Sequence, residues 1–310
     1  MRFVRIEGFS PRRFLPALCV VSFLCGVLSC SRSKPAVPDS PPPELPEAES
    51  VVSEEGLPDL AEAIARLGEA RDAADTAEFA GLLSLVFDNA AIPPDMRQRI
   101  TGAMADSPAF ILDLLSCLEE DPSLRTLVDK QHPLPEGYEP ADLVELRDAS
   151  YRVNRANLTL RKAAADSLEE MARAAKAEGI TLLASSAYRS YAYQAEVYNR
   201  IVREMGREAA DRESARPGFS QHQTGLTVDF GSIDDSFAET AAGRWMASNA
   251  PRFGWSLSFP QGYEALTGYR WESWHYRYVG KELASFIDNY FDGIQQYALR
   301  FIYEWETLPF

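Results

Sequence analysis

PGFSQHQTGLTVD, residues 217–229, and ESWHYRY, residues 272–278, are the stretches that decide what this chain can be. Two of the three histidines of the chain, His222 and His275, lie in these runs, and Asp229 closes the first one. A catalytic zinc ion typically takes three imidazole or carboxylate ligands and leaves a fourth position for water. Two histidines and one aspartate meet that requirement, so the two runs together indicate a catalytic zinc (Zn2+) site.

Glu272 precedes His275 by three residues, and this spacing constrains the local structure. On a regular strand the two side chains would point to opposite faces unless a bend or bulge intervened. The aromatic residues of the segment 269–278 favour extended chain over helix. We therefore expect this run at a strand end that turns, where His275 binds the metal and Glu272 reaches the metal-bound water.

A carboxylate beside such a water can act as the general base of a hydrolytic reaction. It takes the proton as the water attacks a carbonyl and returns it to the leaving amine. Asp229 cannot share this role if it is already a ligand, so the role falls to Glu272. Amide hydrolysis is the reaction class that these residues favour.

At this point the residues resemble a known family. The pattern SxHxxGxxxD, residues 220–229, followed by ExWH, residues 272–275, resembles the VanY-type D-alanyl-D-alanine carboxypeptidases, the M15-class zinc peptidases that trim peptidoglycan stem peptides. SAYRSYAYQ, residues 186–194, is similar to the arginine motif of that family, and the segment 127–143 is similar to its opening segment. The four motifs occur in the order of the family, over residues 127–280.

The resemblance implies the same three ligands and the same base, and it adds three residues. Arg189 would stand near the metal and stabilise the oxyanion or the carboxylate of the substrate, which suits a permanently charged planar donor. The alternative for Arg189 is an ordinary surface ion pair. Ser220 and Gln194 match positions that contact the substrate in the family.

The chain departs from the family pattern at four positions, none of which removes a ligand or the base. Gln221 stands where glutamate is common, and Ser258 where the family often has arginine. Thr227 stands where alanine is common and Ser273 where proline is common. The first two departures bear on substrate preference more than on activity.

The predicted fold class is α+β, a small, mostly antiparallel sheet with helices on one side. The resemblance implies the hedgehog/D-Ala-D-Ala peptidase fold, in which the metal lies in a groove on the sheet. The expected elements of this catalytic domain are a helix over 160–178 ended by Gly179, a strand over 180–184, a helix over 193–205, and strand-forming runs at 226–230, 255–259 and 269–278.

The amino terminus predicts export. Four arginines within the first thirteen residues precede an apolar stretch, 14–29, that has the layout of a secretory signal peptide. It ends in VLSC, residues 27–30, which resembles a bacterial lipobox. We expect residues 1–29 to be a signal peptide and Cys30 to be lipidated, so that a membrane-anchored lipoprotein faces the periplasm or cell wall. An uncleaved signal anchor and a plain secreted protein are the alternatives, and both also export the domain.

Three further segments complete the predicted organisation. Residues 30–57 form a linker rich in proline and glutamate that cannot build a core. Residues 58–126 show helical periodicity, indicating a small segment of about four short helices with a packing role. Residues 281–310 form an aromatic-rich tail beyond the resemblance, with no predicted function.

The net charge limits the classes of partner that we expect, and Cys117 and His132 are expected to have no catalytic role. A net charge of −15 argues against nucleic acid and anionic membrane surfaces as partners, so we expect membrane contact only through the N-terminal anchor. Cys117, in an apolar run, is expected to be a buried small side chain and no nucleophile. His132 is expected to be an ordinary core or surface histidine.

The sequence therefore predicts an exported zinc carboxypeptidase that removes the terminal D-alanine from peptidoglycan stem peptides. One alternative is an L,D-carboxypeptidase that acts on tetrapeptide stems. Another is a non-catalytic wall-binding lipoprotein. Glu272 beside an intact ligand set favours an enzyme, because a binding module has no need for a base.

Overall fold

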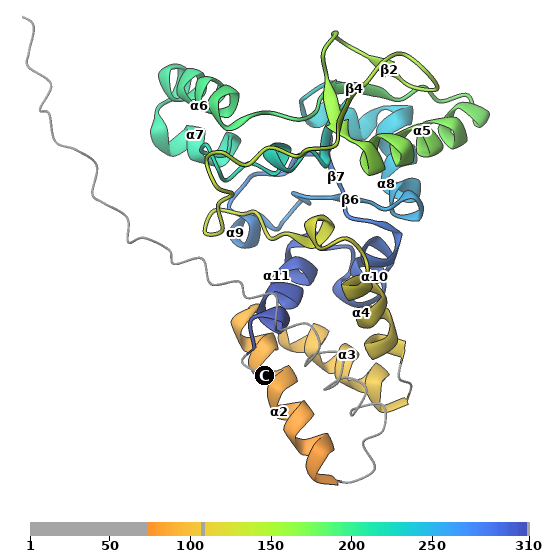
Figure 1. Ribbon diagram of the computed structural model, residues 1–310, viewed down its shortest axis with the longest axis vertical. Coiled ribbons are helices and arrows are strands. Elements are labelled where there is room, and N and C mark those ends of the chain that lie inside the picture. The colour runs from red at the N-terminus through yellow and green to blue at the C-terminus, as the bar shows by residue number, and fades with distance from the viewer. Residues whose placement is uncertain (1–72, 107–108, 309–310) are drawn as a thin grey trace, which may run out of the picture. The chain divides into compact units, whose positions relative to one another are not determined.

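The computed structural model describes residues 73–106 and 109–308 (Figure 1). The predicted signal peptide, Cys30 and the linker lie outside these residues. Within the described part of the chain, no single helix has the length and apolar composition to cross a membrane, and one sharply bent pair, 94–104 with 109–119, meets that test only jointly.

A mixed sheet forms the centre of the catalytic domain (Figure 1). It has five strands in the order β2-β4-β5-β7-β6, and only the β2–β4 pair is parallel. A separate antiparallel pair joins β1 to β3. The sheet and its helices confirm the α+β class. The strands are β1 (Leu143–Glu145), β2 (Arg152–Val153), β3 (Thr159–Arg161), β4 (Leu183–Ser186), β5 (Thr227–Phe230), β6 (Trp255–Leu257) and β7 (His275–Tyr278).

Helix α5 (Lys162–Ala177) covers the sheet with one apolar face, as its periodicity predicts. Leu168 and Met171 on this face are fully buried, and each such burial contributes about 1.5–3 kcal/mol. Ser167 fixes the helix to β6, because its hydroxyl accepts a hydrogen bond from Trp255 Nε1 at 3.0 Å. The helix ends before Gly179, whose φ of +79° a side chain would disfavour.

Two predicted boundaries were wrong for local reasons. The strand expected at 180–184 is β4, Leu183–Ser186, because the Ile180 amide still bonds the helical Ala175 carbonyl. The second helix, α6 (Tyr191–Met205), begins two residues early, because the Ser190 hydroxyl caps it by accepting from the Tyr193 amide.

The run 269–278 was expected to be largely extended, but its first part is not a strand. Residues 273–274 form a turn, and β7 begins only at His275. The predicted placement of ESWHYRY at a strand end that turns is therefore confirmed. Glu272 lies just ahead of the turn, and its amide donates to the Phe259 carbonyl at 3.0 Å.

Helices from both ends of the described chain share one hydrophobic core. Phe110 of α4 packs against Phe286 of α10 and Phe301 of α11, with ring centroids 5.3 and 5.7 Å apart. Cys117 is buried in the same core, as predicted, and burial raises the pKa of its thiol to about 12. The C-terminal segment thus completes the packing of the preceding helical segment. These helices are α2 (Ala73–Asn89), α3 (Pro94–Asp106), α4 (Ala109–Glu119), α10 (Lys281–Phe291) and α11 (Gln295–Glu306).

Asp129 joins α11 to the start of the catalytic domain. One carboxylate oxygen accepts from Gln296 Nε2 at 2.7 Å, and the other lies 2.7 Å from His132 Nδ1. Burial acts to raise the pKa of Asp129, but the hydrogen bonds from His132 and the Gln131 amide outweigh it and lower that pKa to about 2. His132 is therefore a structural residue, as predicted.

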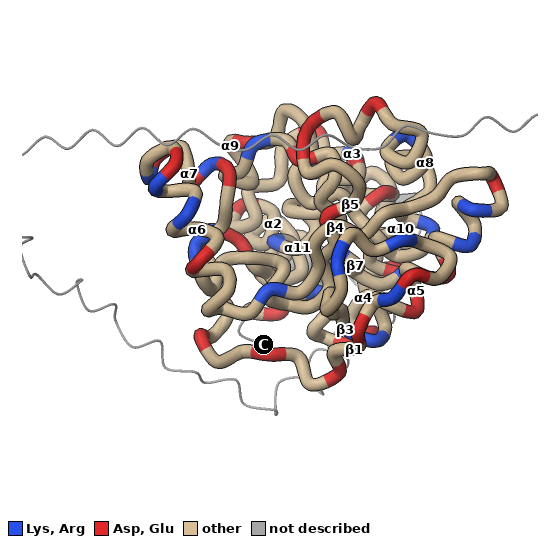
Figure 2. Tube along the Cα trace, turned by 90° about the horizontal axis from the view of Figure 1, so that it is seen from above, with Lys and Arg blue, Asp and Glu red and all other residues tan. Residues whose placement is uncertain are grey.

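Short helices connect the sheet to the helices around it, and charged residues lie along the surface helices. Acidic and basic residues are interspersed along α5, α6 and α7 (Figure 2), and the pairs that they form on the surface contribute little to stability. The connecting helices are η1 (Pro122–Arg125), α7 (Arg207–Glu213), η2 (Gln221–Thr224), η3 (Asp235–Glu239), α8 (Ala241–Asn249), η4 (Ala250–Phe253) and α9 (Glu264–Thr267).

Candidate active site

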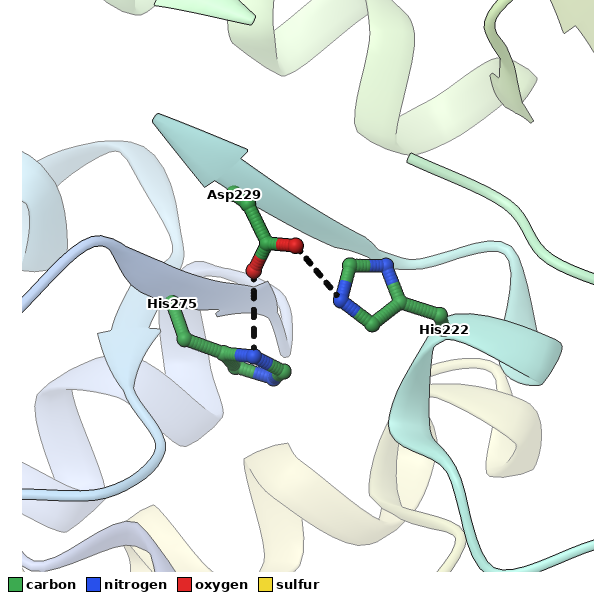
Figure 3. A group of neighbouring side chains, drawn as sticks. All are labelled: His222, Asp229 and His275. Carbon is green, nitrogen blue, oxygen red and sulfur yellow. Dashed lines mark ion pairs between the residues drawn. The ribbon is translucent and has the colours of Figure 1, made fainter. Parts of the chain in front are cut away.

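Three elements bring the predicted ligands together (Figure 3). Asp229 on β5 lies directly opposite His275 on β7, so both side chains leave the same face of the sheet. His222 comes from η2, which Ser220 caps by accepting from the His222 amide at 3.3 Å. Gly225 ends this turn at a φ of +70°, where a Cβ would lie 2.9 Å from Arg161 Cγ. Only glycine fits there, so this glycine shapes the return of the chain to β5.

The ligand atoms converge on one point. His222 Nε2 lies 3.1 Å from Asp229 Oδ2, and His275 Nδ1 lies 3.2 Å from Asp229 Oδ1 (Figure 3). One candidate donor atom from each residue falls within 4.8 Å of the others, and all three side chains are buried. The predicted cluster is therefore present in the folded domain.

This cluster fits a metal ion. Among the described residues, His222 Nε2 and Asp229 Oδ1 are buried polar atoms without a hydrogen bond of acceptable geometry. Leaving such atoms unpaired is costly, and a cation between them removes that cost. Two imidazoles and one carboxylate form a ligand set that zinc uses in catalytic sites.

Hydrogen bonds on the far side of each ring select the ligand nitrogen. His222 Nδ1 lies 2.7 Å from the Ala187 carbonyl, which can only accept, so Nε2 carries the free lone pair. His275 Nε2 lies 3.3 Å from Gln221 Oε1, which leaves Nδ1 facing Asp229. Partners of this kind orient the ligands of a metal site.

A metal ligand must be a neutral imidazole or an ionised carboxylate, and two of the three residues are already in this protonation state. Burial and the positive charge of Arg189 lower the pKa of His222 to about 4, so its imidazole is neutral. Burial acts to raise the pKa of Asp229, but the interactions with both imidazoles outweigh it and hold that pKa well below its usual range.

His275 differs, because it carries a proton when no metal is bound. Burial acts to lower the pKa of His275, but the Asp229 and Glu272 carboxylates close to its Nδ1 outweigh burial and raise that pKa to about 9. A metal ion must therefore displace this proton when it binds.

Glu272 lies next to the ligands. Its Oε2 atom is 3.2 Å from His275 Nδ1, and the residue is 8% exposed on the wall of the cleft. A carboxylate in this position can hold or move a proton beside the metal site. The structure thus places Glu272 beside the ligands, and its role as the base stays a prediction.

Arg189 lies in the site and not in a surface ion pair. Its Nη2 donates to Asp229 Oδ2 at 2.9 Å, and its Nη1 donates to Gln194 Oε1 at 3.0 Å. Its Nε donates to Ser186 Oγ at 3.2 Å. A guanidinium has five N–H donors, so one remains on each terminal nitrogen for a ligand in the cleft.

The two residues predicted to contact the substrate have different positions. Ser220 lines the cleft beside the metal site. Gln194 is fully buried, where its oxygen accepts from Arg189 and its nitrogen donates to the Ala215 carbonyl at 2.7 Å. This arrangement makes Gln194 a support for Arg189. This supporting role was not predicted, because the motif alone marked Gln194 as a contact to the substrate.

A cleft of about 420 Å³ opens onto these residues, and its size suits a short peptide. The wall formed by α6 carries Tyr193 and Met205, and Ile233 lies on the loop after β5. Arg155 and Arg200 also line the cleft, and within residues 73–106 and 109–308 neither forms an ion pair. The cleft thus offers both apolar surface and free positive charge.

Comparisons with known proteins agree with this geometry. Residues 157–281 match the VanY family model, described as D-alanyl-D-alanine carboxypeptidase. YodJ of Bacillus subtilis (strain 168), assigned as a carboxypeptidase, is 39% identical over 186 residues, which cover 57% of this chain and 68% of YodJ. A D-alanyl-D-alanine carboxypeptidase of Enterococcus faecalis (strain ATCC 700802 / V583) is 32% identical, covering 52% of this chain and 60% of that relative. The solved structure of the LD-carboxypeptidase LdcB is 38% identical with a TM-score of 0.51, covering 56% of this chain and 89% of LdcB.

Proposed function

Because the chain belongs to the VanY family of D-alanyl-D-alanine carboxypeptidases, a family of zinc metallopeptidases, we propose that it removes the terminal D-alanine from peptidoglycan stem peptides. One observation supports this most strongly. His222, Asp229 and His275 offer ligand atoms within 4.8 Å of one another, and Glu272 lies 3.2 Å from His275 in the same cleft.

In amide hydrolysis the residues of the site have three roles, which are metal binding, proton transfer and stabilisation of negative charge. His222 Nε2, Asp229 and His275 Nδ1 would hold zinc, which supplies a Lewis acid and acidifies a bound water. Glu272 takes the proton of the attacking water and then gives it to the leaving amine of D-alanine. The free N–H groups of Arg189 donate to the substrate carboxylate or to the developing oxyanion.

The charge of the cleft supports an anionic peptide as substrate. Arg155 and Arg200 lie on its wall without an ion pair in the described part of the chain, although the chain has a net charge of −15. A stem peptide ends in a free carboxylate. Unpaired guanidinium groups in a cleft favour such a ligand by charge and by hydrogen bonding.

An L,D-carboxypeptidase activity is the second candidate. LdcB is an LD-carboxypeptidase, and its sequence is 38% identical to the matched part of this chain. The two activities use the same metal chemistry and differ in the residue that precedes the cut.

Product analysis separates these activities. The purified zinc-loaded protein is incubated with a synthetic stem pentapeptide and, in parallel, with the tetrapeptide that ends one residue earlier. The D,D-carboxypeptidase proposal expects alanine from the pentapeptide. Release of alanine from the tetrapeptide alone would establish the second candidate in its place.

We also propose that the enzyme is exported and works as a membrane-anchored lipoprotein facing the periplasm or wall. The support is the signal-like segment 1–29 and the lipobox-like sequence before Cys30. Lipidation at Cys30 is tested by fatty-acid labelling of wild type and Cys30→Ala, followed by cell fractionation. Label in wild type and release of the unlabelled variant from the membrane are expected. Unlabelled wild type would leave only the signal-anchor or plain secreted alternative.

A further inference from the structure

Gln295, the first residue of α11, reaches from the C-terminal segment into the sheet that carries the metal site. It lies outside residues 157–281, which match the family model, and it is 1% exposed. Its Nε2 donates to the Ser256 carbonyl of β6 at 3.2 Å. Its Oε1 lies 3.4 Å from Gln221 Nε2.

Gln221 links Gln295 to a metal ligand. Its Oε1 lies 3.3 Å from His275 Nε2 and also accepts from Ser258 Oγ at 2.7 Å. All of these side chains are buried, so water does not compete for their hydrogen bonds. Gln221 and Ser258 are two of the four positions where the sequence departs from the family pattern.

The Ser256 carbonyl gives this chain of hydrogen bonds a direction. A carbonyl can only accept, so the amide nitrogen of Gln295 faces it and the amide oxygen faces Gln221. The nitrogen of Gln221 then faces Gln295, and its oxygen faces His275. His275 must therefore carry its proton on Nε2, which leaves the lone pair of Nδ1 for a metal ion.

We propose that Gln295 is a positioning residue of the metal site. Together with Gln221, it fixes the tautomer and the ring orientation of His275 and so sets the affinity for zinc. The C-terminal helix pair then has a role at the active site besides its packing role. This inference rests on zinc as the metal of the proposed function, but it does not depend on the peptide that is cut.

The test compares Gln295→Met with Gln296→Met. Gln296 is its neighbour on α11, is 3% exposed, and donates to Asp129, which lies outside the ligand cluster. Methionine keeps the length of the side chain and removes its hydrogen bonds, so both variants should lower the melting temperature of the metal-free protein. The decisive readout is the zinc dissociation constant, measured by chelator competition at fixed pH.

Gln295→Met should weaken zinc binding by about 10- to 100-fold, the usual effect of losing a partner that orients a ligand. Gln296→Met should bind zinc as wild type does. Equal zinc affinity in the two variants would overturn the proposal.

Gln221→Met provides a second route if Gln295→Met does not fold. It should show the same loss of zinc affinity, and where both single variants fold, the double variant should lose little more, because both residues act through one path. Wild-type zinc affinity in Gln221→Met, or losses that add in the double variant, would contradict the proposed path. Zinc binding is measured without peptide, so failure of the proposed carboxypeptidase activity would be seen separately, in the peptide assay.

Discussion

At the scale of single residues, the buried atoms of His222 and Asp229 are the ones that a metal ion would satisfy. The ligands come from two distant segments, so the site exists only in the folded domain, and metal binding stabilises that domain by linkage. The chain offers its own control, because His132 is the one histidine outside the cluster.

His222→Ala, Asp229→Ala and His275→Ala should each lower the zinc content of the purified protein well below one ion per chain. His132→Ala should keep wild-type zinc content, since its ring bonds Asp129 and not the cluster. Elemental analysis after dialysis measures this. If each cluster variant kept about one zinc ion, the ligand assignment would be wrong.

Arg189 should affect the rate and not the metal. Its guanidinium bonds Asp229 but is no ligand, so Arg189→Ala should retain zinc while kcat/KM falls by about 10²- to 10³-fold. Arg189→Lys should recover only part of the rate, because a point charge cannot replace a planar donor. Wild-type kinetics in Arg189→Ala would remove this residue from the mechanism.

At the scale of elements, Asp129 holds α11 against the start of the catalytic domain. Its folded pKa of about 2 lies below the usual 3.8, so its contribution to stability is present above about pH 4 and is lost as the pH falls toward 2. Asp129→Asn should lower the melting temperature at neutral pH and flatten the loss of stability between pH 4 and 2. Thermal unfolding of metal-free wild type and variant across this range measures the difference, and parallel curves would refute it.

The sequence predicted the elements whose signals are local. The helix α5 that ends before Gly179 and the turn before His275 both follow from neighbouring residues. The start of α6 was missed because Ser190 acts as a cap three residues ahead of the predicted start at 193. β4 was predicted to start too early. The Ile180 amide donates to the Ala175 carbonyl of α5, and the residue types of this segment do not reveal such a backbone hydrogen bond.

Contacts between distant segments could not be predicted in this way. Gln295 meets Gln221 across 74 positions, and Phe110 meets Phe301 across almost the whole described chain. Neither contact produces a periodic pattern, so the C-terminal segment looked like a tail without a role. The two runs that carry His222, Asp229 and His275 were linked by the ligand chemistry of these residues and by the resemblance to a known family.

At the scale of the whole molecule, the helices around Phe110 should be essential for stability. Phe110 is 1% exposed among Phe286, Tyr290 and Phe301, so Phe110→Ala should cost about 3–5 kcal/mol. Leu112 on the same helix is 55% exposed, and Leu112→Ala should change stability by less than about 0.5 kcal/mol. Urea unfolding of both variants checks this, and equal costs would show that this core is not formed.

The central claim is that this fold brings a general base to a zinc site in order to cut a peptide. Glu272→Gln tests it most directly, because the amide keeps the size of the side chain and leaves all three ligands in place. The measurement is D-alanine released from a stem pentapeptide by zinc-loaded wild type and variant, with zinc content determined in the same samples. We predict equal zinc content and a rate that falls by about 10²- to 10⁴-fold in the variant. Wild-type turnover by Glu272→Gln would contradict the role of the base, and a zinc-loaded wild type that released no alanine from any stem peptide would contradict the enzyme itself.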